Sequence, residues 1–392
     1  MEEIKQGYKQ TDIGVIPEDW DIRPIGEVLK VTTGNKNTQD KKDDGIYPFF
    51  VRSQTVERIN TYTFDGEGVL TAGDGVGTGK VFHYINGKFD YHQRVYLMHG
   101  FEDKVLGKYF FLFFSKYFYE RINQLTAKSS VDSVRREMIA DMLLPLPKKD
   151  EQTAIATALS DTDALIVTLD KKIAKKQQIK QGAMQQLLTG KKRLPGFSGE
   201  WVEKALGECF TKIVGGGTPS RANPDYWNGN IPWATVKDFA SFNVNATQEY
   251  ITNVGLMNSS SHLIPKDTPI TSTRMGLGKI MVYNVDVAIN QDLKALFIKD
   301  DYDQNYIVHW FTFSSEIIEA LGTGSTVKGI RLEQLRNINI FLPVDKYEQT
   351  AIAQILTDMD NDIAQLEKER DKYKELKAGM MQVLLTGKVR LV

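Results

Sequence analysis

One segment of the chain occurs twice, and this repeat constrains the fold more than any other feature. The first copy runs from Glu151 to Leu194 and the second from Glu348 to Leu391; both begin EQTAIA and both contain LLTGK near the end. Each residue of the first copy corresponds to the residue 197 positions later, without a gap, and roughly half of the positions are identical. Since this period is too long for a solenoid, we infer that the chain consists of two similar halves.

Apolar residues recur every seven positions in both copies, which predicts two long helices of the coiled-coil type. Arg370 and Lys377 interrupt one apolar series, and Gly190 and Gly387 suit C-terminal caps. Each helix has about 38 residues and a length of roughly 57 Å. We expect the two helices to pair with each other; the alternative is that each packs on its own domain or on a partner chain. The apolar positions are Ile155, Leu159, Ile166, Leu169, Ile173 and Leu187, and Ile352, Leu356, Met359, Ile363, Leu366, Tyr373, Met380 and Leu384.

The amino-acid composition limits which classes of protein this chain can belong to. The chain has 392 residues, 41% of them hydrophobic, and a formal net charge of −1, so any contact with nucleic acid depends on local patches. A single cysteine, Cys209, excludes an internal disulfide and a cysteine-rich metal site. The charged N-terminus is unlike a signal peptide, and the tract Phe110–Phe114 is too short to span a bilayer, so we expect a buried helix face and a cytoplasmic protein.

The similarity between the halves extends beyond the helices. Trp20 precedes Gly26 by six residues as Trp201 precedes Gly207, and glycine turns follow at Gly34 and at Gly215–Gly217. Short apolar runs separated by turn residues predict strands, followed in each half by a helix. The predicted strands are Tyr47–Val51, Val69–Ala72, Val81–Ile85 and Val95–Met98, and Ile231–Val236, Pro269–Thr273, Ile280–Tyr283 and Leu293–Ile298; the helices are Val105–Leu125 and Asn305–Leu321.

These elements predict an α+β fold with two mixed α/β domains and two long helices. The first domain is expected at residues 1–148 and the first helix at 149–190. The second domain and helix are expected at 191–344 and 345–392. The domains differ in sequence far more than the helices do, which indicates two readers of different specificity on a common spacer.

Two short motifs invite a catalytic interpretation, and both fail. Gly73–Lys80 is not a phosphate loop, because Asp74 stands where the first glycine belongs and Val81 follows the lysine; a tight hairpin is expected instead. Asn223–Tyr226 is similar to the adenine N6-methyltransferase motif, but Asp225 replaces a proline and no cofactor loop precedes it. The five histidines show no metal spacing, so we predict no catalytic residue and no metal site.

Polar and basic residues in turns are the candidates for DNA contact, because Gln, Asn and Arg are able to read base edges while cations bind phosphates. His92–Arg94 corresponds to Asn290–Asp292, and Arg135 to Arg331 in a loop that precedes the last strand. Taken singly, a residue of this kind is more often a solvated surface charge. The candidates are Arg52, Lys80, His92, Gln93, Arg94, Lys128, Arg135 and Arg136 in the first half, and Arg221, Lys237, Arg274, Lys279, Asn290, Gln291, Lys328 and Arg331 in the second.

The chain resembles the specificity subunits of type I restriction–modification systems. The resemblance covers essentially the whole chain and depends on TDIGVIPEDW at Thr11–Trp20, GGGTPSRANPDYWNGNIPW at Gly215–Trp233 and the two EQTAIA…LLTGK helices. It implies two target-recognition domains held apart by an antiparallel pair of helices with pseudo-twofold symmetry. Each domain is expected to read one half of a bipartite, asymmetric target in double-stranded DNA.

The resemblance also implies the partners. The chain is expected to have no chemistry and no cofactor of its own: two modification subunits methylate adenine with S-adenosylmethionine, and restriction subunits use ATP and Mg. The modification subunits are expected to dock on the helices around Lys180–Thr189 and Lys377–Thr386. Two alternatives remain open here: a self-sufficient DNA methyltransferase, and a coiled-coil scaffold that binds only proteins.

Overall fold

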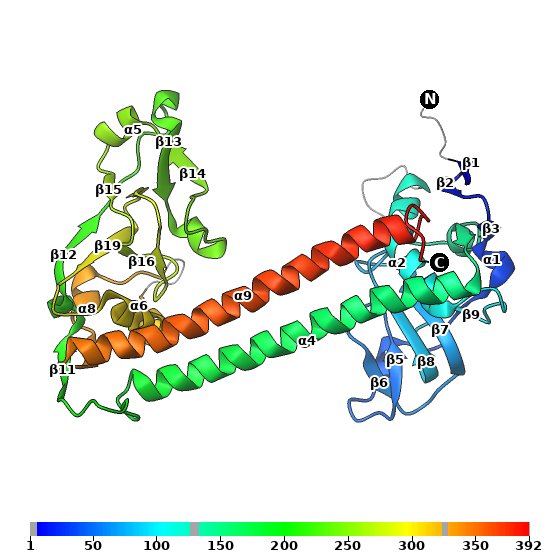
Figure 1. Cartoon of the computed structure of the whole chain (residues 1–392), viewed down its shortest axis with the longest axis horizontal. Helices are drawn as coiled ribbons and strands as arrows, with labels where there is room; N and C mark the ends of the chain where they lie inside the picture. The colour runs from blue at the N-terminus through cyan, green and yellow to red at the C-terminus, as the bar shows by residue number, and fades with distance from the viewer. Residues whose placement is uncertain (1–5, 126–132, 324–327, 392) are drawn as a thin grey trace. The chain divides into compact units, whose positions relative to one another are not determined.

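The computed structural model describes residues 6–125, 133–323 and 328–391. The chain divides into two compact units (Figure 1). Unit 1 consists of residues 1–170 and 368–392, and unit 2 of residues 171–367. Helix α4 (Lys149–Leu187) and helix α9 (Lys346–Leu384) therefore each contribute one segment to each unit. The two long helices expected from the repeat are confirmed.

Unit 1 is built on a six-stranded sheet with the order β4-β9-β7-β8-β5-β6, in which only β5 and β8 are parallel within the described residues. All four strands predicted for this half are present. The strands are β1 (Tyr8–Thr11), β2 (Gly14–Pro17), β3 (Asp21–Pro24), β4 (Lys30–Thr33), β5 (Tyr47–Phe50), β6 (Glu57–Ile59), β7 (Phe64–Ala72), β8 (Phe82–Tyr91), β9 (Val95–His99) and β10 (Leu143–Leu146), and the helices are α1 (Ile25–Val28), η1 (Thr38–Asp40), α2 (Gly107–Leu125) and α3 (Arg136–Ala140).

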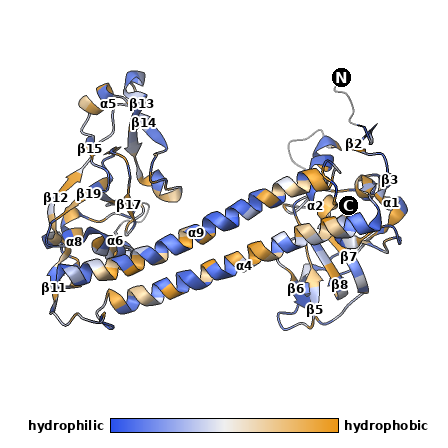
Figure 2. Cartoon of the chain, in the orientation of Figure 1, coloured by the Kyte–Doolittle hydropathy of each residue, from blue (hydrophilic) through white to orange (hydrophobic). Residues whose placement is uncertain are grey.

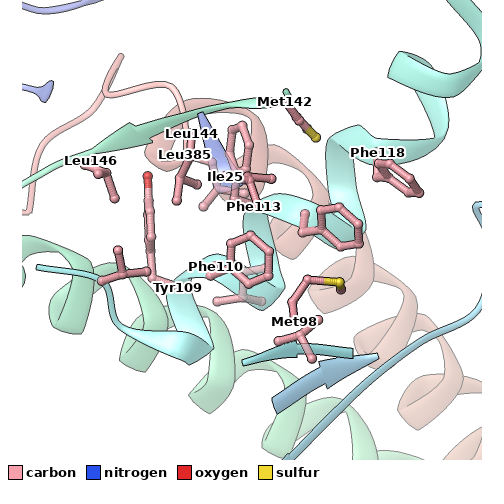
Figure 3. Packing of buried hydrophobic residues seen from close by; sticks show 14 of the residues in the cluster. Ile25, Met98, Tyr109, Phe110, Phe113, Phe118, Met142, Leu144, Leu146 and Leu385 are labelled. Atoms are coloured by element: carbon pink, nitrogen blue, oxygen red, sulfur yellow. The ribbon is translucent and has the colours of Figure 1, made fainter. Parts of the chain in front are cut away.

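Helix α2 lies in the main hydrophobic core of unit 1, where its side chains pack with residues such as Ile25, Met98 and Leu144 (Figure 3). Phe110, Phe114 and Phe118 follow at intervals of four residues, so their rings lie on one face of the helix, and the ring centroids of consecutive members are 5.4 and 4.3 Å apart. All three are fully buried. Burying each such side chain contributes about 1.5–3 kcal/mol, so the apolar tract is the buried helix face that was predicted.

Unit 2 has two four-stranded sheets instead, with the orders β12-β19-β16-β17 and β14-β13-β18-β15. The predicted strands are again present. The strands are β11 (Trp201–Ala205), β12 (Phe210–Gly215), β13 (Trp227–Ala234), β14 (Glu249–Ile251), β15 (His262–Ile264), β16 (Pro269–Ser272), β17 (Ile280–Val282), β18 (Val287–Ile289), β19 (Leu293–Ile298) and β20 (Asn339–Pro343), and the helices are η2 (Leu206–Cys209), η3 (Pro224–Tyr226), η4 (Val236–Ala240), α5 (Asn253–Met257), α6 (Gln304–Phe313), α7 (Ser315–Ala320) and α8 (Leu332–Arg336).

The helix predicted over Asn305–Leu321 is wrong in one respect, because it is two helices that meet at Ser314. The loop before β17 reaches the backbone at this point. A Cβ on Gly278 would lie 2.4 Å from the carbonyl oxygen of Ser315, whereas a Cβ on the equivalent Gly79 of unit 1 would meet the side chains of Ile122 and Tyr119. The break therefore coincides with a close approach to the main chain, which a local sequence pattern does not record.

Apolar and polar residues alternate along both long helices (Figure 2), and most predicted apolar positions are buried or half-buried. The polar interruptions form ion pairs between the helices. In unit 1 Lys377 bonds Asp163 at 2.6 Å, and in unit 2 the corresponding Lys180 bonds the corresponding Asp360. Further pairs join Arg370 to Asp170 at 3.5 Å and Lys176 to Asp362 at 2.7 Å. Within each unit, residue numbers rise along α4 while they fall along α9, so the paired segments are antiparallel.

A buried arginine–glutamate pair joins the end of one long helix to the start of the other in each unit; we call it the closing ion pair. In unit 2, Arg193 donates from Nε and Nη2 to the two carboxylate oxygens of Glu348, both at 2.7 Å. In unit 1, the corresponding Arg390 bonds Glu151 in the same way and also pairs with Asp19. Both glutamates are at most 1% exposed, so the arginines neutralise carboxylates that water does not reach.

The glutamine that follows each of these glutamates is also buried and fastens its unit to the helix. Gln152 accepts from the amide of Leu106 at 2.8 Å, and Gln349 accepts from the amide of Asp303 at 2.8 Å. Each amide group also donates to a proline carbonyl, that of Pro147 or of Pro343, at 2.8 and 2.9 Å. The repeated EQ dipeptide is therefore a structural element that connects each long helix to the strand before it.

Candidate nucleic-acid interface

Three loops of unit 1 meet at the end of β7, and we call this place the junction. The amide of Gly73 donates to the carbonyl of Arg94 at 2.8 Å, and the amide of Val134 donates to the carbonyl of Gly73 at 2.7 Å. An isolated bridge joins Asp74 to Ser133. The candidates of the turn His92–Arg94 are thus brought against the loop Gly73–Lys80 and against the segment that leads to Arg135.

Unit 2 has the same junction with different side chains. The amide of Thr273 donates to the carbonyl of Asp292 at 2.9 Å, and the amide of Ile330 donates to the carbonyl of Thr273 at 2.9 Å. An isolated bridge joins Arg274 to Gly329. The backbone of the junction is therefore common to both units, although the residues that it presents are not.

The first residue of each predicted turn serves the backbone. His92 is 5% exposed, and its Nδ1 accepts from the amide of Arg94 at 3.0 Å. Asn290 is 6% exposed, and its Oδ1 accepts from the amides of Asp292 and Leu293, both at 3.2 Å. Burial, with Arg52 as a further cause, lowers the pKa of His92, which favours the neutral ring. Both side chains hold the turn in shape, and the residue that follows each of them is exposed.

Those neighbours are two glutamines with partners that the sequence did not single out. Gln93 donates to Oδ1 of Asn37 at 2.6 Å, and Gln291 accepts from Oγ1 of Thr218 at 2.6 Å. Asn37 and Thr218 each follow a glycine turn that crosses the strand before the junction. A Cβ on Gly34 would lie 2.0 Å from the carbonyl oxygen of Tyr91, so this crossing requires glycine. The matched glycines of the two halves were the sequence signal that pointed to these partners.

The charges of the unit 1 junction centre on Asp74. Nη1 of Arg52 bonds Oδ1 of Asp74 at 2.7 Å, and Nη1 of Arg94 bonds Oδ2. Burial opposes ionisation of the carboxyl, but the hydrogen bonds from Arg94 and Arg52 outweigh it and lower the pKa of Asp74. The carboxylate side chain is 16% exposed, whereas those of Arg52 and Arg94 are 40% and 62% exposed. The two guanidinium groups are thus fixed side by side at the surface.

The unit 2 junction presents its cations differently. Arg274, Lys279 and Lys328 are exposed, and no ion pair involves them within the part of the chain that the structure describes. Met275, next to Arg274, has a φ of 58°, and its amide donates to the carbonyl of Lys328 at 3.2 Å. A non-glycine residue in this left-handed region is uncommon and is found most often at functional sites.

Arg221 lies elsewhere in unit 2, on an aromatic surface. Its guanidinium makes a bidentate pair with Glu249, at 2.6 and 3.0 Å, and stacks on Trp227 with the Cζ atom 3.6 Å from the ring centroid. The hydrogen bond from Arg221 lowers the pKa of Glu249. These contacts hold the arginine in one position, while its side chain remains 54% exposed.

The remaining candidates are exposed cations near the junctions, except for one residue that the structure does not describe. Lys80 lies in the loop after β7 with its Nζ 5.6 Å from the ring of Tyr119. Arg135 and Arg331 directly precede α3 and α8, respectively. The other exposed residues are Arg136, in α3, and Lys237, in η4; Lys128 lies outside the described residues.

The rejected motifs are structural turns. Gly73–Lys80 lies in the hairpin loop between β7 and β8, and a Cβ on Gly77 would lie 2.6 Å from the carbonyl oxygen of Arg52, so the close approach is to the chain itself. Asn223 caps η3 by accepting from the amide of Asp225 at 3.1 Å. Among the described residues, no cluster of His, Cys, Asp and Glu is placed to hold a metal ion. No described helix is both long and apolar enough to cross a membrane.

Comparisons with known proteins identify the family. The model of the type I restriction modification DNA specificity domain matches residues 17–181 and 198–378. The MjaX specificity subunit of Methanocaldococcus jannaschii, itself provisionally assigned, is 27% identical over 99% of this chain and 97% of its own length. The MjaVIII specificity subunit of the same organism is 24% identical over 99% and 98%. The EcoR124I/EcoR124II specificity subunit of Escherichia coli is 30% identical over 62% and 63%.

Two solved structures share the fold. The S subunit of the type I system of M. genitalium has a TM-score of 0.65 at 16% sequence identity and covers 96% of this chain and 97% of its own. A chain from a structure on complex assembly and conformational transition of the type I R-M system has a TM-score of 0.57 at 16% identity and covers 95% and 99%. The chain therefore belongs to the type I restriction–modification DNA specificity family and is a specificity subunit, whose role in the restriction–modification complex is DNA recognition and not catalysis.

Proposed function

We propose that each unit reads one half of a bipartite, asymmetric target in double-stranded DNA. The junction is the main support for this proposal. The same backbone hydrogen bonds present His92, Gln93 and Arg94 in unit 1 but Asn290, Gln291 and Asp292 in unit 2. Side chains that differ on a shared backbone present different donors and acceptors to base edges. Two different half-sites follow from one duplicated framework.

The long helices, on this proposal, form an antiparallel coiled coil that sets the unread spacer and relates the halves by a pseudo-twofold axis. The equivalent ion pairs Lys180–Asp360 and Lys377–Asp163, and the two closing ion pairs, support it. Each helix has 39 residues, a length of about 58 Å at 1.5 Å per residue. This exceeds the roughly 34–36 Å between two major-groove sites one turn of DNA apart. The domain limits are then residues 1–148 and 191–344, with helical spacers at 149–190 and 345–392.

We infer further that two modification subunits dock on the helices, around Lys180–Thr189 and Lys377–Thr386, and that restriction subunits join this complex. A pocket in unit 1 supports the second of these surfaces, because Leu385 and Thr386 line it together with Ile13, Phe113 and Tyr117. S-adenosylmethionine, ATP and Mg belong to the partners in this division of labour.

Replacement of one recognition domain tests the proposal. Residues 21–146 are exchanged for the equivalent segment of another family member, so that Trp20, Pro147 and both long helices stay. The complex is reconstituted with its modification subunits, and its methylation sites are mapped by sequencing. We expect one half of the target to change while the other half and the spacer stay.

The competing functions give other outcomes. A change in both halves contradicts modular reading. Methylation of DNA by the purified chain alone favours a self-sufficient methyltransferase. A reconstituted complex without any sequence preference favours a scaffold that binds only proteins.

A further inference from the structure

The two junctions exchange their charges at equivalent positions. The amide of Gly73 bonds the carbonyl of Arg94 as the amide of Thr273 bonds that of Asp292, so Asp74 corresponds to Arg274 and Arg94 to Asp292. An acid and a base in unit 1 are thus a base and an acid in unit 2. Sequence alignment of the loops alone does not reveal this exchange, because the first loop is one residue longer.

The second guanidinium of unit 1 has no counterpart in unit 2. Phe50 pairs with Tyr91 in the parallel ladder of β5 and β8, and Ala234 pairs with Ile289 in the ladder of β13 and β18. Arg52, two residues after Phe50, therefore corresponds to Val236. Unit 1 presents two arginines around one carboxylate, and unit 2 presents one arginine and a separate carboxylate.

Most N–H donors of the two arginines are not used in bonding Asp74. Each guanidinium has five N–H groups, and Arg52 and Arg94 each use Nη1 to bond Asp74. Because the guanidinium group is planar, the carboxylate that fixes its orientation also fixes the directions of the remaining N–H groups. Without Asp74, two like charges held this close together repel, and both side chains lose their orientation. Asp74 also repels phosphates, so it opposes binding that does not depend on base sequence.

We propose that Asp74 is a positioning residue that directs Arg52 and Arg94 to guanine in the half-site read by unit 1. The exchanged charges of unit 2 then select a different base in the half-site that unit 2 reads. Guanine offers two acceptors, O6 and N7, in the major groove, which match arginine donors. Asp292 and Gln291 supply acceptors, which match the exocyclic amino group of cytosine or adenine. This inference rests on the proposed function, since it names the bases that the two units read.

The test measures discrimination one base pair at a time. Full-length chain in complex with its modification subunits is bound to a DNA library randomised over both half-sites, and the selected sequences are counted. The variants are Asp74→Asn, Arg94→Gln and Asp292→Asn. Asp43→Asn is the matched control, because it removes the same charge from a side chain of unit 1 that is 96% exposed.

We expect Asp74→Asn and Arg94→Gln to reduce discrimination at the same G·C base pair of one half-site by about tenfold. Asp74→Asn should at the same time raise affinity for random DNA a few fold, because it removes a negative charge beside two arginines. If Asp74 had only a structural role, Asp74→Asn would weaken binding to all sequences. Discrimination would then not fall while affinity for random DNA rises. Asp292→Asn should alter only the other half-site, and Asp43→Asn should leave discrimination unchanged.

The contrary outcomes are distinct. If the wild-type complex selects a bipartite target and Asp74→Asn and Arg94→Gln leave every position unchanged, or affect different half-sites, the inference is wrong while the proposed function stands. If the loss falls on an A·T pair, the assignment of guanine is wrong. If the wild-type complex selects no sequence, the proposed function itself fails and the inference fails with it.

Discussion

Units 1 and 2 close on the long helices through the same contacts but present different surfaces. The closing ion pairs Arg390–Glu151 and Arg193–Glu348 are equivalent, as are the bonds of Gln152 and Gln349. Yet strand β8 of unit 1 runs unbroken from Phe82 to Tyr91, while unit 2 has the short strands β17 and β18 at the corresponding place. Contacts that assemble a unit on its helices are thus retained, whereas the sheet that carries the junction has diverged.

Substitutions in the closing ion pairs should change the stability of the two units most, and by different amounts. Arg193→Gln leaves the buried Glu348 without its cation and should give the largest fall in the free energy of unfolding of unit 2. Arg390→Gln should cost unit 1 less, because Nε1 of Trp20 still donates to Glu151 at 3.0 Å. The corresponding Nε1 of Trp201 is buried without a partner among the described residues.

Hydrogen–deuterium exchange of the strand pairs β3–β10 and β11–β20 measures the two units separately. Arg23→Gln is the control, since its pair with Glu27 is largely exposed and should contribute little. Equal destabilisation of the two units by Arg193→Gln and Arg390→Gln would show that Trp20 does not support Glu151.

His309 of α6, which has no counterpart in α2, should make unit 2 sensitive to acid. His309 is 7% exposed, and its Nε2 lies 3.0 Å from Oγ1 of Thr357. Burial, and then Lys180, lowers the pKa of His309, although Asp360 and Asp303 oppose this. The corresponding residue of unit 1 is Leu112, as the bonds from Gln152 and Gln349 align the two helices.

Because the folded state holds this histidine neutral, the unfolded state binds the proton more readily. Stability of unit 2 is therefore full above pH 6.5 and falls below it, by at most about 1.4 kcal/mol for each pH unit. Exchange protection of α6, measured between pH 7.5 and 5.5 and corrected for the intrinsic rate, should fall more in the wild-type chain than in His309→Leu. An equal fall in the two chains would assign the acid sensitivity of α6 to another group.

The loops before β8 and β17 offer the smallest test. Gly75 has a φ of 78°, and the equivalent residue of unit 2, Met275, has a φ of 58°. Because methionine has a Cβ, unit 2 bears a backbone strain that unit 1 avoids. Met275→Gly should stabilise unit 2, and Gly75→Ala should destabilise unit 1, each by about 1 kcal/mol. A Cβ at Gly75 comes no closer than 3.8 Å to another atom, so steric overlap does not obscure the effect in thermal unfolding. Loss of stability in Met275→Gly would mean that packing of the methionine outweighs its backbone strain.

Regular elements were predicted well from the sequence, and the contacts between loops were not. The apolar tract Phe110–Phe114 and the seven-residue repeats identified helices because the spacing of apolar residues along the chain is a local property. The candidate Arg94 was correctly placed in a turn, but its partner Asp74 was considered only as a defect in a phosphate-loop motif. Asn37 and Thr218, which bond Gln93 and Gln291, were missed, because the matched glycine turns before them do not by themselves show which strand each turn crosses.

By itself, the sequence determined that the chain is duplicated, that each half ends in a long helix, and that the whole resembles one family of DNA specificity subunits. Only the tertiary structure decided which side chains meet. Asp74 is 22 residues from Arg52 and 20 from Arg94, and Arg390 is 239 residues from Glu151. Helical periodicity is fixed by neighbours a few positions away, whereas these contacts depend on strand order and register, which arise only when the sheets form and the long helices pair.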